Sequence, residues 1–270
     1  MLNSKLICIF LVVILLAGCS VPQDTNQLQD PSVQSLRTVQ AKVSASPSPV
    51  SLPEVTPTPT PVPSDFLTIA GNRETLLSLI ESYNLAQALA YVNDYIETNS
   101  PPSSDSAYHL QASLDTAIPL MRSCRVRHDS FDNTYEVYYP HYDKITKDVS
   151  VVAKLLNDRL SIIVGFVSSD WVFFTNYEVR DSKANLLTTG EVDYFDVTRD
   201  VLRGRVCEYA EVDLDGLFYI ISADSPTIRF YDSDHAKHYD HTFSKKECTA
   251  LDTIASLHFL LSSVRDFLVS

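Results

Sequence analysis

The chain has 270 residues, of which 34 are acidic and 21 basic, so its formal net charge at pH 7 is −13. An acidic balance of this size repels phosphate backbones and anionic lipid headgroups, so it argues against nucleic-acid binding and against electrostatic docking on a membrane. The residues beyond position 64 are numerous enough to form one domain with a sizeable core.

The first nineteen residues have the pattern of a secretory signal peptide. Lys5 supplies a positive charge, and residues 6–17 (LICIFLVVILLA) form an apolar run. This run is shorter than the roughly 20 residues that a membrane-spanning helix needs. Small residues follow it at the expected cleavage point.

The end of this segment, Leu16-Ala17-Gly18-Cys19, resembles the lipobox of bacterial lipoproteins. In that family the cysteine receives a diacylglyceryl group and becomes the first residue of the mature chain. The resemblance covers residues 1–20 and implies that Cys19 anchors the protein to the lipid bilayer on the extracytoplasmic face. Two or more acyl chains hold a protein durably on a bilayer. The alternatives are an uncleaved apolar anchor, or a signal cut elsewhere.

Residues 20–64 are expected to be a disordered linker rich in Pro, Ser and Thr. Proline occupies seven of the eighteen positions from Ser46 to Pro63. Because proline fixes φ and donates no backbone hydrogen bond, this segment favours extended polyproline II. At about 3.1 Å per residue it could hold a domain some 55 Å from its anchor. Residues 65–270 are expected to form a single domain.

The first part of this domain, residues 72–123, is predicted to be helical. Apolar residues recur at steps of three and four, which indicates an amphipathic helix, or two abutting ones, that Asn72 could cap. A second helix is expected from about Ser104, with a kink or boundary at Pro119. Together these segments predict an N-terminal helical hairpin.

The second part, residues 124–270, is predicted to contain a mostly antiparallel sheet. We expect a short helix at 149–156, a helix at 214–223 capped by Asp213, and a C-terminal helix. The C-terminal helix should begin at a capping box, Ser244 to Glu247, and pack on the sheet. The expected strands are 124–128, 135–139, 160–167, 171–180, 192–197, 205–212, 227–231 and 238–243. The predicted fold class is therefore α+β.

Cysteine usage gives little functional information. Cys8 would leave with the signal peptide and Cys19 would carry lipid, which leaves Cys124, Cys207 and Cys248. Three cysteines allow at most one disulfide, and no CxxC pair suggests zinc or redox chemistry. Each is expected to be a small buried hydrophobic residue.

A histidine-rich segment, Asp232 to His241, is a candidate metal site. Imidazoles and carboxylates are ligands for zinc and other divalent ions, and the candidates are His235, His238, Asp240 and His241. On a strand, however, His238 and Asp240 would face away from His241. The alternative is a polar hairpin turn in solvent.

A second candidate is an aromatic platform for a sugar or peptide ligand. Four tyrosines occur within eight residues, Tyr135, Tyr138, Tyr139 and Tyr142, and Trp171 is the only tryptophan. Flat rings offer a large contact area at low entropic cost. The alternative is that these rings are core and rim positions of strands.

The sequence shows no catalytic or cofactor motif. It contains no GxGxxG or GxxxxGK[ST] loop, no GxSxG elbow and no HExxH pair, so no cofactor is predicted. We expect a non-enzymatic domain that binds an unknown protein or envelope partner. The alternatives are a cell-envelope hydrolase, possibly metal-dependent through the histidine-rich segment, and a solute-binding component of a transporter. The transporter class would need alternating strands and helices in two lobes, which the sequence lacks.

Overall fold

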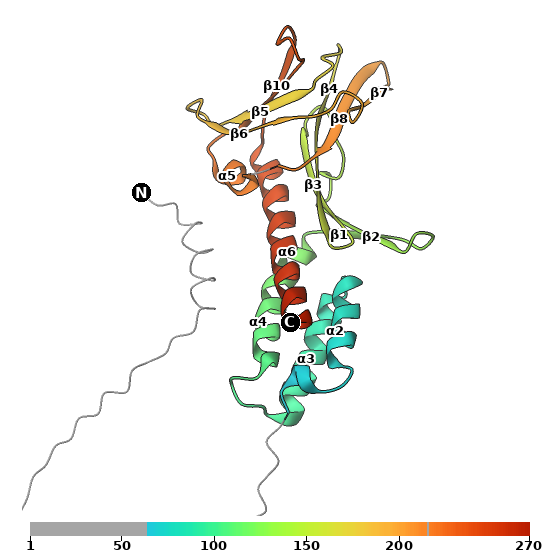
Figure 1. Ribbon diagram of the computed structural model, residues 1–270, viewed down its shortest axis with the longest axis vertical. Helices are drawn as coiled ribbons and strands as arrows, with labels where there is room; N and C mark the ends of the chain where they lie inside the picture. The colour runs from blue at the N-terminus through green and yellow to red at the C-terminus, as the bar shows by residue number, and fades with distance from the viewer. Residues whose placement is uncertain (1–63, 215) are drawn as a thin grey trace, which may run out of the picture. The chain divides into compact units, whose positions relative to one another are not determined.

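The computed structural model describes residues 64–214 and 216–270 (Figure 1). The predicted signal peptide, Cys19 and the predicted linker up to Pro63 lie outside the described residues. Within the described part, the N-terminal helices lie at one end of the domain and two antiparallel sheets at the other, and one long helix, α6, runs between them. The predicted α+β class is confirmed.

The helical part begins with a short 3₁₀ turn, Phe66–Thr68, followed by α2 (Asn72–Glu81), α3 (Leu85–Asn99) and α4 (Ser106–Arg122). The first arm of the expected hairpin is thus two abutting helices. They separate at Tyr83, whose φ of 57° ends the regular helix. The residue at the N-cap of α2 is Gly71, not Asn72. Pro119 lies inside α4, near its end.

Two antiparallel sheets form the other part. The first has the order β1-β2-β3-β4-β8-β7 and the second the order β10-β9-β5-β6. The strands of the first are β1 (Arg125–Asp129), β2 (Thr134–Tyr138), β3 (Val151–Leu156), β4 (Arg159–Ser168), β7 (Thr198–Leu202) and β8 (Arg205–Val212); those of the second are β5 (Asn176–Arg180), β6 (Leu186–Glu191), β9 (Thr227–Tyr231) and β10 (His238–Thr242). Phe166 of the first sheet packs on Phe230 and Tyr239 of the second.

The helix predicted at 149–156 is wrong, because Val151–Leu156 forms strand β3. Val151, Val152 and Ala153 are all buried, so the strand lacks the alternation of apolar and polar residues that marks a half-exposed strand. A short apolar run of this kind cannot be distinguished from a helix by periodicity alone.

The expected strand at 192–197 is also wrong, because this segment connects β6 to β7. The helix at 214–223 is confirmed as α5 (Leu217–Ser222), but its N-cap is Gly216 and not Asp213. Gly216 has a φ of 79°, a conformation that glycine adopts without steric strain.

Only the second half of the strand expected at 171–180 is a strand. Before it, the fully buried carboxylate of Glu208 accepts hydrogen bonds from the backbone N–H groups of Val172, at 2.7 Å, and of Phe173 and Phe174, both at 3.0 Å. Arg199 lies 3.5 Å from the same carboxylate. Phe173 has a φ of 58°. A buried charge must be paired and hydrogen-bonded, so Glu208 fixes this irregular segment.

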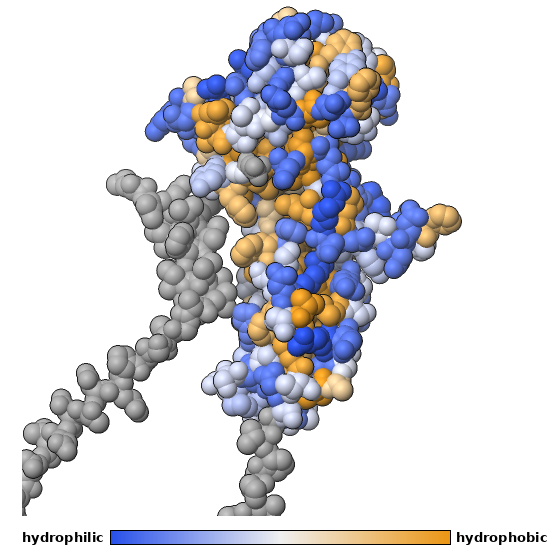
Figure 2. Space-filling model, in the orientation of Figure 1, coloured by the Kyte–Doolittle hydropathy of each residue, from blue (hydrophilic) through white to orange (hydrophobic). Residues whose placement is uncertain are grey.

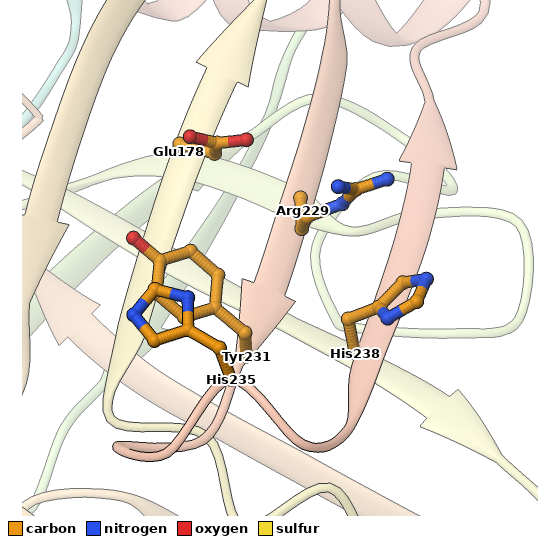
Figure 3. A pocket seen from close by; sticks show the side chains of 5 residues that line it. All are labelled: Glu178, Arg229, Tyr231, His235 and His238. Carbon is orange, nitrogen blue, oxygen red and sulfur yellow. The ribbon is translucent and has the colours of Figure 1, made fainter.

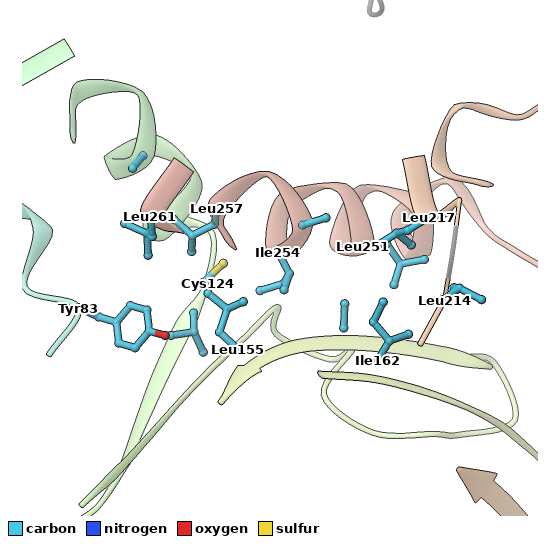
Figure 4. Close-up of a cluster of buried hydrophobic side chains, with 14 of the residues drawn as sticks. Tyr83, Cys124, Leu155, Ile162, Leu214, Leu217, Leu251, Ile254, Leu257 and Leu261 are labelled. Atoms are coloured by element: carbon cyan, nitrogen blue, oxygen red, sulfur yellow. The ribbon is translucent and has the colours of Figure 1, made fainter. Parts of the chain in front are cut away.

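The C-terminal helix α6 (Lys245–Val269) packs on the first sheet, as predicted (Figure 4). The predicted capping box is confirmed, since Ser244 Oγ accepts from the N–H of Glu247 and the Glu247 carboxylate accepts from the N–H of Ser244. Leu251, Ile254 and Leu257 are completely or almost completely buried against strands that include Leu155 and Ile162.

Cys124 and Cys207 are buried, in keeping with the expected hydrophobic role, whereas Cys248 is half-buried. Burial raises the pKa of Cys124 to about 11, which keeps its thiol protonated and unreactive at neutral pH. In the part of the chain that the structure describes, no helix combines the length and the hydropathy needed to cross a bilayer.

We predict that Ile254→Ala lowers the free energy of unfolding by about 2–5 kcal/mol, because it leaves a cavity in a fully buried position. The matched control is Phe259→Ala on the same helix, whose side chain is 57% exposed and whose removal should change stability much less. Urea denaturation of both variants measures this, and equal losses would contradict the assignment of the buried face of α6.

Candidate functional site

The structure does not bring the four proposed metal ligands together. His238 and Asp240 lie on the exposed face of β10, and His241 points to the opposite face, as the strand alternation predicts. Asp240 is held by Arg229 through two bonds of 2.7 Å, and His241 Nε2 lies 2.9 Å from Glu247. The described residues contain no group of three or more His, Cys, Asp or Glu side chains that could hold a metal ion.

A shallow pocket of about 160 Å³ lies on the outer face of the second sheet (Figure 3). Its lining is Glu178, Arg229, Tyr231, His235 and His238, and His235 stacks on Tyr231 with 4.3 Å between ring centroids. The charges here already have partners within the protein. Glu178 is paired with Arg180, and that hydrogen bond lowers the pKa of its carboxyl. The pKa of Asp240 is lowered in the same way by Arg229. Charges paired in this way have little capacity left for a ligand.

The five rings of the predicted aromatic platform lie in different environments. Tyr135 and Tyr139 pack against the core, whereas Tyr138 lies under the guanidinium of Arg127 at 4.9 Å. Tyr139 contacts Tyr142 edge to face, and Trp171 stacks on Phe173. No ring contact in the described part of the chain joins Trp171 to these tyrosines, so the five rings do not form one surface.

Tyr135 belongs instead to a larger pocket, of about 430 Å³, where the helical part meets the first sheet. We call this pocket the junction cleft. The end of α2, the start of β2, the turn between β3 and β4, and the last turns of α6 all contribute to it. Its lining residues are Ser78, Glu81, Ser82, Asn133, Tyr135, Asn157, Asp158 and Arg265.

Arg265 is the distinctive residue of the junction cleft. Its Nε atom is buried without a well-aligned hydrogen bond, and its guanidinium forms no ion pair with any carboxylate of the described residues. The neighbouring Tyr83 hydroxyl is buried too, and its closest polar neighbour is the Arg265 guanidinium, which it meets without ideal hydrogen-bond geometry. Burial raises the pKa of Tyr83, and the positive charge of Arg265 opposes part of this rise. Tyr83 is thus the neutral neighbour of the Arg265 guanidinium, whose positive charge has no carboxylate partner within ion-pair distance among the described residues.

Two asparagines are fixed at the rim of the cleft. Asn157 Oδ1 accepts from the Tyr135 N–H at 2.9 Å, which ties the β3–β4 turn to β2. Asn133 Oδ1 lies 3.2 Å from His128 Nε2. In each case the side-chain oxygen is bound to the protein, so the amide nitrogen remains available as a donor.

Chemically, the junction cleft offers one guanidinium, amide donors, hydroxyl groups and the carboxylates of Glu81 and Asp158. This set suits the binding of a small polar molecule, because convergent polar groups in a concave pocket fix the orientation of a ligand. The cleft holds no cysteine, and Ser78 and Ser82 have no histidine beside them in its lining, so it lacks an activated nucleophile of the usual kind.

Sequence reasoning identified only Tyr135 among the residues of this cleft. The dipeptide Asn157-Asp158 could have been found as a hairpin turn, but the helix wrongly predicted at 149–156 concealed the hairpin. Arg265 gave no signal, because an arginine on the polar face of a helix is ordinarily a solvated charge. Its position beside Tyr83 depends on the tertiary fold.

Comparisons of the chain with models of protein families, with curated proteins and with solved structures find no match. The function is therefore inferred from the residues and their geometry.

We predict a pH dependence of stability from His258, which shares the cleft-facing side of α6 with Arg265. Its pKa is lowered, first by burial and then by the charge of Arg265. The unfolded chain therefore takes up this proton first, so the free energy of unfolding should fall as the pH drops through about 6.5, the pKa of unfolded histidine.

When the pH is lowered from about 7.5 to about 5.5, the free energy of unfolding should fall less in the His258→Gln variant than in the unmodified chain. Carboxylates titrate little in this range. Chemical denaturation at both pH values measures the difference. If the two proteins lose equal stability, His258 is not the responsible group.

Proposed function

We propose that this protein is a lipid-anchored extracytoplasmic lipoprotein whose α+β domain binds a small polar ligand in the junction cleft without transforming it. The observation that supports this most strongly is the guanidinium of Arg265, which forms no ion pair with a described carboxylate and lines a pocket of about 430 Å³. Ligand pockets commonly span about 300–1,000 Å³. An unmade hydrogen bond at a buried group costs free energy that a ligand can recover.

The anchoring part of the proposal rests on the sequence. The apolar run, the small residues and Cys19 agree with a lipoprotein signal, and the proline-rich segment suits a spacer between the membrane and the domain. The net charge of −13 fits an anchor that depends on acyl chains and not on attraction to anionic lipids.

Binding through the exposed surface has less support than binding in the cleft. Figure 2 shows apolar and polar residues mixed over the visible face, with an apolar tip on the β1–β2 hairpin. That hairpin carries Phe131, which is 94% exposed, and the β6–β7 connection carries Phe195, which is 90% exposed. Single exposed hydrophobic residues are normal on protein surfaces. They do not by themselves indicate a partner.

The two alternatives also have less support. A metal-dependent hydrolase would need the histidines and carboxylates of the Asp232–His241 segment to converge. His235 and His238 line one pocket, but His241 lies on the other face of β10, and the described residues contain no group of three possible metal ligands. A solute-binding transporter component would be expected to have two lobes of alternating strands and helices. The sheets of the described domain are antiparallel throughout.

We predict that Cys19→Ser abolishes lipid attachment. In a bacterial expression host, labelled fatty acid should be incorporated into the unmodified chain, which should be recovered with the membranes, whereas the variant should take up no label. Cys8→Ser is the matched control, because Cys8 lies in the signal peptide and would be cleaved off with it. Labelling of the Cys19→Ser variant would contradict the anchor.

We also predict that the Cys19→Ser chain binds at least one of a panel of small polar probes: L-lysine, L-glutamate, glucose and inorganic phosphate. A ligand that binds only the folded state raises the melting temperature. The rise should disappear in Arg265→Gln and persist in Arg229→Gln, whose arginine lies on the outer sheet. If no probe raises the melting temperature, or if every rise persists in Arg265→Gln, the proposed cleft function is wrong.

A further inference from the structure

We propose that the junction cleft recognises a molecule that carries both a carboxylate and ammonium groups, namely a basic amino acid or a short peptide ending in one. This inference rests on the proposed binding function and specifies the chemical class of the ligand.

Arg265 would bind the carboxylate. A guanidinium presents parallel N–H donors that match the two oxygens of a carboxylate, and such charge-assisted bonds are among the strongest in proteins. Arg265 lies between Val264, which is 1% exposed, and the fully buried Leu268 one turn later. These neighbours hold the last turns of α6 in place, so the guanidinium is positioned before a ligand arrives.

Glu81 and Asp158 would bind the ammonium groups. Glu81 is the last residue of α2, and Asp158 lies in the turn between β3 and β4, so the two carboxylates reach the cleft from different elements. Neither forms an ion pair with a basic residue of the described chain. The cleft thus holds unpaired charges of both signs.

The sum of these charges favours a basic ligand over a neutral one. One guanidinium and two carboxylates give the lining a formal charge of −1. A neutral zwitterion would leave this charge unbalanced, whereas an amino acid with a cationic side chain carries +1 and neutralises it. The overall charge of −13 would also attract a cationic molecule from solution.

The remaining lining residues fit the rest of such a molecule. Tyr135 stacks on His128 with 4.2 Å between ring centroids, so its orientation is fixed. An aromatic ring can contact an aliphatic chain or a cation. The amide groups of Asn133 and Asn157 can donate to the carboxylate or to a peptide carbonyl group.

The test is isothermal titration calorimetry of the full Cys19→Ser chain at low salt with four probes. L-Lysine carries both groups, cadaverine lacks the carboxylate, hexanoate lacks the ammonium groups, and L-glutamate carries the opposite net charge. L-Lysine should bind at least about tenfold more tightly than each of the others.

Variants of the cleft test the recognition of the carboxylate and of the ammonium groups separately. Arg265→Gln should weaken L-lysine binding at least about tenfold. Arg265→Lys should bind L-lysine with intermediate affinity, because it keeps the positive charge but loses the two parallel N–H donors. The double variant Glu81→Gln with Asp158→Asn should weaken the binding of L-lysine, which loses its partners for the ammonium groups, but should not weaken any binding of hexanoate. The double variant Arg229→Gln with Asp240→Asn, on the outer sheet, should bind L-lysine normally.

The outcomes distinguish this inference from the general binding function. If L-lysine fails to bind at about 10 mM while glucose or phosphate binds through Arg265, the ligand class is wrong and the cleft function stands. L-Lysine binding that Arg265→Gln and Arg265→Lys leave unchanged would place its site elsewhere. If no probe binds, both proposals are overturned.

Discussion

The buried carboxylate of Glu247 joins the main parts of the domain. It accepts hydrogen bonds from the backbone N–H groups of Ser150 and Ser244, and it lies 2.9 Å from His241 Nε2. It thereby connects the start of α6 to the first sheet near β3 and to the second sheet at β10. Because a buried charge is tolerated only when its partners are in place, these elements must meet correctly for the domain to fold.

The junction cleft depends on the other end of the same helix. Arg265 lies eighteen residues after Glu247, about 27 Å along the helix axis at 1.5 Å per residue. Over this length α6 passes from the sheets to the helical part. The guanidinium therefore lies where α2 approaches the β3–β4 turn, and an error in the packing of Ile254 or Leu257 would displace it. Stability and the proposed binding are thus linked through one helix.

The sequence was informative where a single element carries its own signal. The capping box at Ser244 and the apolar stripe of α6 predicted the C-terminal helix, and short apolar segments at 135–139, 160–167 and 205–212 predicted β2, β4 and β8. It was misleading where tertiary contacts override local pattern. Strand β3 is buried on both faces, and Glu208 holds the segment before β5 out of the sheet. The cleft could not be predicted, because its residues come from four separate elements.

The central claim is that Arg265 is the centre of a binding site. It is tested most directly by the NMR signal of its Nε–H group in the full Cys19→Ser chain, assigned by its loss in Arg265→Lys. On addition of L-lysine this signal should shift, because a carboxylate then accepts hydrogen bonds from the same guanidinium. An unchanged Arg265 signal, with shifts confined to the β9–β10 hairpin, would contradict the account.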